Sequence, residues 1–144
     1  MTDKNIESPL DILKQRAFLM SEIRDFFRQR DVLEVETPVL SSAANTDLQI
    51  DVFQTQAIKT GEHRAFLRTS PEFFHKRLLA QGSGDIFELA KVFRKGETTP
   101  RHNPEFTMLE WYRLGFQMSE LMTEVVALIQ YLRQQFNMAS MVIN

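Results

Sequence analysis

Three side chains in the second half of the chain have chemistry suited to a nucleotide: Arg94, Phe106 and Glu110. The guanidinium group of Arg94 suits a phosphate, because it is always charged and presents a planar fork of N–H donors. The ring of Phe106 offers an aromatic surface for a purine. The carboxylate of Glu110 suits a hard cation such as the Mg²⁺ that accompanies phosphates. These residue types therefore predict contacts with ATP.

Two predicted strands position these side chains. Residues 86–94 and 105–113 contain runs of β-branched, aromatic and aliphatic residues, whereas the connection at 95–104 contains one glycine and two prolines, which interrupt strands. The pattern predicts a β-hairpin with a long loop. Because strand side chains alternate between faces, each strand contributes four side chains to the face that carries the charges. These are Glu88, Ala90, Val92 and Arg94 from the first strand, and Phe106, Met108, Glu110 and Tyr112 from the second.

The complete string at residues 87–111, FELAKVFRKGETTPRHNPEFTMLEW, is much more specific than any single residue in it. It resembles motif 2 of the class II aminoacyl-tRNA synthetases, and RHNPEFTMLEWY is the form found in the lysine branch of that family. This branch comprises lysyl-tRNA synthetases and their shorter paralogues, the elongation factor P lysine ligases. A charged residue on a hairpin is usually a solvated surface residue, but the length of the matching string favours a nucleotide site.

The resemblance implies that motif 2, at about residues 85–113, binds ATP and Mg²⁺. The implied ATP-binding residues are Arg94, Glu97, Arg101, His102, Phe106 and Glu110, with Arg94 as the catalytic residue and Glu110 as the metal ligand. Glu97 is a less direct match, because Gly96 stands where the family signature Phe-Arg-x-Glu has its glutamate. The conformational freedom of glycine would allow the loop to bring Glu97 into that role, and the assignment stays open.

A second site is expected at the start of a helix after residue 70. Ser70 has the residue type of an N-cap and Pro71 suits the first helical position. Glu72 complements the positive end of the helix dipole, and Gly82 follows the last turn. The resemblance adds a substrate role, in which Glu72 contacts an ammonium group of the amino acid. Ser70 stands where lysyl-tRNA synthetases usually have alanine, and resembles the elongation factor P ligases, in which it is associated with room for (R)-β-lysine.

The N-terminal region resembles motif 1 of the same family, at about residues 8–38. Ser8 and Pro9 open a predicted amphipathic helix that stops near Asp31, a residue type that tolerates the left-handed conformation of a helix end. A strand closed by Pro38 follows. In the family, motif 1 forms the dimer interface, so the resemblance implies a homodimer. Without motif 2, a helix followed by a strand and a proline would be weak evidence.

Composition limits the classes of protein that the chain can represent. Its 144 residues, 43% hydrophobic and with 12 phenylalanines, are enough for one globular domain spanning residues 1–144. The net charge of −2 makes tRNA a less likely partner than a small molecule or a protein. No cysteine is present, and no apolar run has the length of a signal peptide or membrane span, so we expect a cytoplasmic protein that does not bind membranes.

The remaining patterns predict supporting elements. Residues 48–52 and 64–69 are expected to form strands, and 118–136 a helix with one apolar side. The three histidines are too scattered to predict a metal site, and His75 is expected to pack inside its helix or to lie at the surface. The fold class is therefore α+β, an antiparallel sheet flanked by helices as in a class II catalytic domain.

Only motifs 1 and 2 are recognisable. Nothing after Trp111 resembles the Gly-rich third motif that a class II catalytic domain needs. We therefore expect the chain to represent the N-terminal portion of such a domain, either as a piece of a longer protein or as a truncated paralogue. Its activity in isolation stays open.

The motifs together predict ATP-dependent activation of (R)-β-lysine as an adenylate, followed by transfer to a lysine of elongation factor P. The substrate could also be α-lysine. One alternative is the catalytic-domain fragment of a lysine–tRNA ligase. Another is a non-catalytic paralogue that dimerises through motif 1 and regulates a partner. ATP binding and adenylate formation with each amino acid would discriminate among the three.

Overall fold

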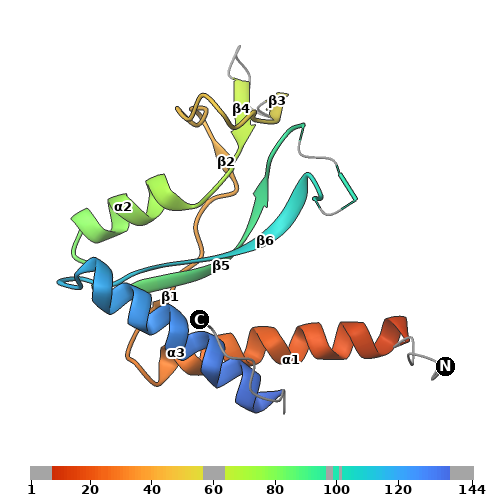
Figure 1. Cartoon of the computed structure of the whole chain (residues 1–144). Coiled ribbons are helices and arrows are strands. Elements are labelled where there is room, and N and C mark those ends of the chain that lie inside the picture. The colour runs from red at the N-terminus through yellow and green to blue at the C-terminus, as the bar shows by residue number, and fades with distance from the viewer. Residues whose placement is uncertain (1–7, 57–63, 97–98, 101, 137–144) are drawn as a thin grey trace. The chain divides into compact units, whose positions relative to one another are not determined.

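The computed structural model describes residues 8–56, 64–96, 99–100 and 102–136 (Figure 1). The helices are α1 (Pro9–Arg28), α2 (Glu72–Ala80) and α3 (Met118–Gln135). The strands are β1 (Leu33–Glu34), β2 (Leu40–Ser41), β3 (Gln54–Gln56), β4 (Arg64–Leu67), β5 (Ile86–Phe93) and β6 (Glu105–Tyr112). None of the helices in these ranges is long and apolar enough to cross a membrane.

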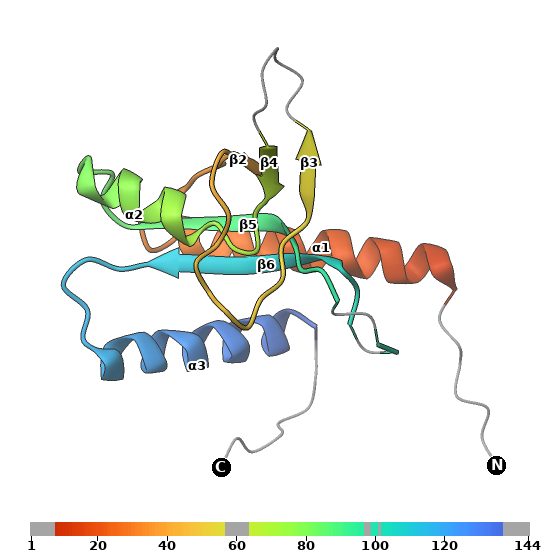
Figure 2. The ribbon, with the colours of Figure 1, turned by 90° about the horizontal axis from the view of Figure 1, so that it is seen from above.

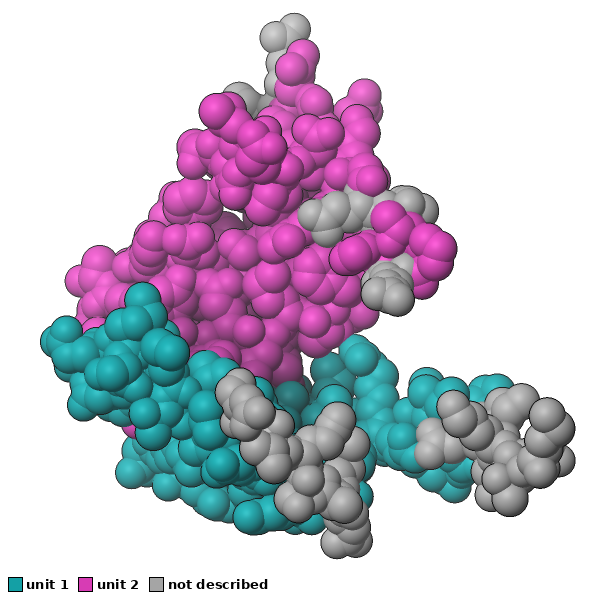
Figure 3. All heavy atoms as spheres, viewed as in Figure 1, with its two compact units in different colours: residues 1–32, 115–144 teal, residues 33–114 magenta. Residues whose placement is uncertain are grey.

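The chain forms two compact units, coloured separately in Figure 3. The first, here called the helical unit, consists of residues 1–32 and 115–144, and the second, the sheet unit, consists of residues 33–114. Motif 1 therefore contributes to both units, whereas motif 2 lies entirely in the sheet unit. The expectation of one domain over residues 1–144 stays a prediction.

The helical unit contains α1, which begins and ends as its sequence predicts. The hydroxyl of Ser8 accepts a hydrogen bond from the backbone N–H of Asp11 at 3.2 Å, which satisfies one of the free donors of the first turn. At the other end, Asp31 has a φ of 55° and reverses the chain. The backbone N–H of Val32 then donates to the carbonyl of Phe27 at 3.1 Å. These contacts confirm the predicted cap and the left-handed helix end.

Aromatic contacts join α1 to α3 within the helical unit. Phe26 and Phe27 are fully buried, and the ring of Tyr131 lies 5.6 Å from that of Phe26, centroid to centroid. The hydroxyl of Tyr131 donates to the carboxylate of Glu22 at 2.8 Å. Gln117 and Glu120 form a capping box at the start of α3, which confirms a helix close to the predicted bounds.

The principal sheet of the sheet unit has the order β1-β5-β6. Strands β5 and β6 pair antiparallel along their whole length, as Figure 2 shows, with Val92 opposite Phe106 and Glu88 opposite Glu110. This register confirms the predicted hairpin and its charged face. Strand β1 pairs with β5 in parallel, so the sheet is mixed and not wholly antiparallel. The α+β class is confirmed.

The smaller sheet has the order β2-β4-β3, with antiparallel pairs throughout. The strand predicted at residues 48–52 is wrong, because 48–50 form a turn and the paired strand is β3. The alternating apolar and polar residues at 48–52 follow a loop that side chains stabilise. The side chains of Asn45 and Asp47 each accept a hydrogen bond from the backbone N–H two residues further along the chain. The predicted strand after α1 is reduced to the short strands β1 and β2, with Pro38 between them.

Helix α2 begins one residue later than the sequence predicts. Its N-cap is Pro71, no side chain caps it, and Glu72 is the first helical residue. The prediction of Ser70 as N-cap is therefore wrong. The backbone N–H groups of Phe74 and His75 both donate to the carbonyl of Pro71 at 3.0 Å. Gly82 follows the helix with a φ of 84°, as predicted for the residue past its end.

Candidate functional site

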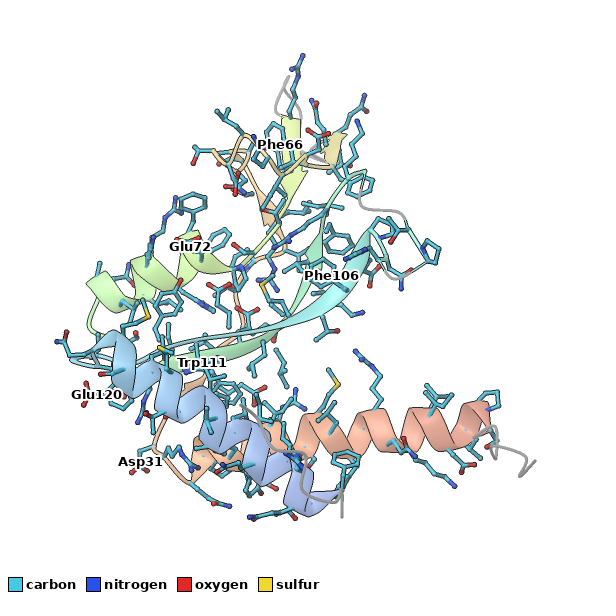
Figure 4. All side chains as sticks on the ribbon, viewed as in Figure 1. Asp31, Phe66, Glu72, Phe106, Trp111 and Glu120 are labelled. Atoms are coloured by element: carbon cyan, nitrogen blue, oxygen red, sulfur yellow. The ribbon has the colours of Figure 1, made fainter. Side chains whose placement is uncertain are left out.

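The sheet unit contains an open cavity of about 780 Å³ beside the charged face of the hairpin, here called the motif 2 cavity. Four predicted site residues line it: Ser70, Glu72, Arg94 and Glu110. The other lining residues are Asn45, Thr46, Asp47, Ile50, Thr69, Phe73, Lys76, Met108, Trp111 and Tyr112. The cavity therefore joins residues from α2, from the hairpin and from the loop before β3. Figure 4 shows the side chains around this part of the sheet unit, with Glu72 and Phe106 labelled.

Arg94 lies at the end of β5, where its side chain meets Phe106. The guanidinium carbon is 5.3 Å from the centre of the Phe106 ring, within the range of a cation–π contact. The backbone N–H of Arg94 donates to the carbonyl of Pro104 at 2.9 Å, which closes the base of the hairpin loop. The arrangement places a permanent positive charge next to an aromatic face. Both features suit a nucleotide, although Phe106 is not among the residues that line the cavity.

The other motif 2 residues contribute differently. His102 is exposed, does not line the cavity, and has its Nδ1 2.8 Å from the Thr99 hydroxyl, so the loop itself holds its ring. Glu97 and Arg101 lie outside the described residues. The geometry thus joins Arg94 with Phe106, and leaves the roles of His102, Glu97 and Arg101 as predictions.

Glu110 reaches the cavity from the centre of β6, with its side chain 19% exposed. The hydroxyl of Tyr112 donates to Glu110 Oε1 at 2.9 Å, and Nδ1 of His75 lies 3.7 Å from the same oxygen. Within the described ranges, no group of three or more His, Asp and Glu side chains is arranged to hold a metal ion. Mg²⁺ at a nucleotide site is usually held by one or two carboxylates together with phosphate oxygens and water, so the assignment of Glu110 as a metal ligand stays a prediction.

The start of α2 supplies a second carboxylate to the cavity. Glu72 is paired with Lys76, one helical turn later, at 2.5 Å between Nζ and Oε1. Both side chains are about half exposed, so this pair is weak and a ligand cation could replace Lys76. Ser70 precedes α2 and also lines a smaller neighbouring cavity of about 190 Å³. The residue therefore lies on a wall common to both cavities, a position that affects the space available to a ligand.

A buried polar network lies beneath the cavity, centred on Glu88 of β5. Its Oε1 accepts from the guanidinium group of Arg68 at 2.8 Å. Its Oε2 accepts from the hydroxyl of Thr37 at 2.6 Å and lies 2.9 Å from Nε2 of His75. Arg68 also donates to the carbonyls of Thr37 and Lys91, each at 2.9 Å. Because every charge has a partner, this network is a fixed frame.

The network changes the pKa of its members in opposite directions. Burial opposes a charge on His75, but the nearby carboxylate of Glu110 and the hydrogen-bonded carboxylate of Glu88 outweigh it and raise the pKa to about 8. Burial also opposes the charge of Glu88, but His75, Thr37 and Arg68 outweigh it and lower the pKa to about 2. Burial and the nearby Glu110 raise the pKa of Tyr112. His75 is therefore cationic at neutral pH, between two carboxylates.

Sequence reasoning missed this network. His75 was expected to pack or to face solvent, and the packing alternative is confirmed, since the residue is fully buried. A signal for two of its partners was present, because Glu88 and Glu110 share one face of the predicted hairpin. No local pattern indicated Arg68 or Thr37, which reach Glu88 from more distant segments.

Comparison with known proteins adds evidence of descent. A profile of the class II tRNA synthetases (D, K and N) matches residues 3–143. The elongation factor P–(R)-β-lysine ligase of Vibrio cholerae is 54% identical over 121 residues, which are 82% of this chain and 37% of that protein. The ligase of the same name from Haemophilus influenzae is 54% identical over 121 residues, 82% of this chain and 38% of the relative. The chain thus spans less than two fifths of the length of these relatives.

Proposed function

Because the chain belongs to the class II tRNA synthetases (D, K and N), as its motifs predicted, we propose that it forms part of an ATP-dependent ligase for (R)-β-lysine. In the first step, a carboxylate oxygen of β-lysine attacks the α-phosphorus of ATP. This forms the aminoacyl adenylate and releases pyrophosphate. In the second step, the side-chain amine of a lysine in elongation factor P attacks the adenylate carbonyl, forms an amide and releases AMP.

The observation that carries the proposal is the meeting of Arg94, Glu72 and Glu110 in one cavity. Phosphoryl chemistry of this kind depends on alignment and on neutralisation of charge, and needs no covalent protein intermediate. Arg94 supplies a fixed positive charge for the α-phosphate in the transition state. Phe106, in contact with Arg94, supplies a surface for the adenine, and His102, Arg101 and Glu97 would complete the ATP site.

The two carboxylates of the motif 2 cavity match a substrate with two ammonium groups. Glu72 suits one ammonium group, which would take the place of Lys76 in the half-exposed ion pair that Lys76 forms with Glu72. Glu110 suits the other, because the contacts of its Oε1 with Tyr112 and His75 fix the carboxylate while its side chain remains partly accessible. Both lysine and β-lysine have this double charge. Ser70, on the wall common to both cavities, is proposed to select between them.

Other parts of the proposal rest on the family. Mg²⁺ would neutralise phosphate charge when bound, and we assign Glu110 to the substrate in place of the metal. A homodimer through residues 8–38, elongation factor P as acceptor, and a cytoplasmic location are likewise proposals. The relatives' names favour this ligase over a lysine–tRNA ligase fragment. A paralogue without catalysis would bind no ATP, which calorimetry would show.

The test is ATP–pyrophosphate exchange by the full-length gene product with (R)-β-lysine or L-lysine. We expect exchange that is faster with β-lysine, and a loss of roughly 10²–10³-fold in Arg94→Ala, the size found when a donor to a transition-state charge is removed. Lys91→Ala is a matched control, because Lys91 is an exposed cation on the same strand. Exchange with L-lysine alone would overturn the β-lysine assignment, and equal loss in both variants would remove Arg94 from the site.

A further inference from the structure

His75 lies between the buried network and the motif 2 cavity, in a position that the proposed reaction does not yet use. Its side chain is fully buried in α2. One edge of the ring, at Nε2, is 2.9 Å from Glu88, and the opposite edge, at Nδ1, is 3.7 Å from Glu110. The ring also meets Tyr112 edge to face, with centroids 5.5 Å apart. His75 therefore lies between Glu88 of the buried network and Glu110 of the cavity, and it also contacts Tyr112, which donates a hydrogen bond to Glu110.

The Glu88 side of the ring is held rigidly. Thr37 and Arg68 occupy both oxygens of Glu88, and Arg68 is itself held by backbone carbonyls. The imidazole consequently has little freedom to rotate or shift. On its other side, Nδ1 is buried and has no hydrogen-bond partner within the described part of the chain. A buried polar atom without a partner is costly, so its aim towards Glu110 requires an explanation.

We propose that His75 is a positioning residue, which transmits the rigid frame around Glu88 to Glu110 and so sets where the cavity presents its inner carboxylate. This inference rests on the proposed function, since it assigns Glu110 to an ammonium group of the substrate. The Tyr112 hydroxyl restrains Glu110 from within the same strand, and His75 restrains it from the helix. A carboxylate restrained by a hydrogen bond from one element and an ion pair from another has less rotamer freedom to lose when the ligand arrives, which favours binding.

Two substitutions separate this role from simple packing. His75→Gln places an amide nitrogen near the position of Nε2, and so keeps a donor to Glu88 while it removes the group that faces Glu110. His75→Asn places an amide near Nδ1, and so keeps the side that faces Glu110 and removes the contact with Glu88. If His75 only supported the core, the change in amino-acid KM would follow the loss of stability from one variant to the next.

The measurement is ATP–pyrophosphate exchange by the full-length protein, with (R)-β-lysine and L-lysine as probes. For His75→Gln we expect the KM for the amino acid to rise about tenfold, because the group that faces Glu110 is removed. The KM for ATP and the kcat should change much less. For His75→Asn we expect a lower melting temperature than in His75→Gln, but an amino-acid KM closer to that of the parent. Phe27→Leu is the control for stability, because Phe27 is a fully buried residue of α1 in the helical unit and does not line the motif 2 cavity.

Each outcome is informative. An unchanged amino-acid KM in His75→Gln, or a KM that follows melting temperature through all three variants, would overturn the positioning role and leave the ligase proposal intact. Absence of exchange, together with absence of lysine and β-lysine binding by calorimetry in the parent protein, would overturn the proposed function and this inference with it.

Discussion

The helical unit and the sheet unit differ in how much charge they bury. Among the described residues, the helical unit buries Glu124, whereas the sheet unit buries Arg68, His75 and Glu88 in contact with one another. In the helical unit, Phe26 and Phe27 are fully buried and aromatic rings make the contacts between α1 and α3. In the sheet unit, Glu88 and His75 are buried as well, and Glu88 is paired with both His75 and Arg68. Apolar burial stabilises without a required orientation, whereas a buried ion pair costs desolvation unless its geometry is kept. The contrast indicates that the sheet unit is built to hold particular atoms in place.

The largest expected effect comes from breaking the network at its centre. Glu88→Ala leaves Arg68 and His75 buried without their shared partner, and we expect a loss of about 3–5 kcal/mol in the free energy of unfolding. Chemical denaturation followed by circular dichroism measures this change. Glu88→Gln, which keeps the shape and some hydrogen bonds, should lose less. A loss below about 1 kcal/mol in Glu88→Ala would show that water replaces the carboxylate readily.

A cavity in the helical unit provides the matching test. Phe26→Ala removes a fully buried ring that contacts Tyr131, and we expect a loss of about 3–4 kcal/mol. The same denaturation experiment measures it. The folded Phe26→Ala protein should keep the parental KM for ATP and amino acid, because Phe26 lies in the helical unit and does not line the motif 2 cavity. A raised KM would contradict the assignment of the site to the sheet unit.

The network also predicts a pH dependence of stability. The pKa of His75 is raised from 6.5 to about 8, so its contribution is full below pH 6.5 and is lost as the pH rises through 8, a change of about 2 kcal/mol. The pKa of Glu88 is lowered from 4.5 to about 2, so its contribution is present above pH 4.5 and is lost as the pH falls through 2. Unfolding free energies measured from pH 3 to 9 should therefore be highest between about 4.5 and 6.5. His75→Gln should remove the alkaline decline, and persistence of that decline would assign it to another group.

The smallest effect is expected for a polar contact at the edge of the aromatic cluster. Tyr131→Phe removes the hydroxyl that donates to Glu22 but keeps the ring against Phe26. We expect a loss of about 0.5–1.5 kcal/mol, the usual contribution of one hydrogen bond. Thermal unfolding measures it, with Glu22→Gln as the partner variant. A loss as large as that of Phe26→Ala would show that polar geometry matters in the helical unit too.

Much of the fold followed from local chemistry. The cap at Ser8, the left-handed Asp31 and the common face of Val92 and Phe106 agree with predictions from residue type and alternation. The predictions failed at Ser70 and in residues 48–52, where caps and alternation depend on how the loop packs. Of the candidate site, the sequence indicated Arg94, Glu72 and Glu110, and the structure places these in one cavity.

The sequence by itself determined the strand and helix that carry each functional group, and, through its long motif, the family. Those properties depend on neighbours in the chain: periods of two and of 3.6 residues, and caps within one turn. Only the tertiary structure decided that His75 lies between Glu88 and Glu110, and that Arg68 and Thr37 hold Glu88 from segments 20 and 51 residues away. Contacts of that range depend on the packing of whole elements, and no spacing within a single element specifies them.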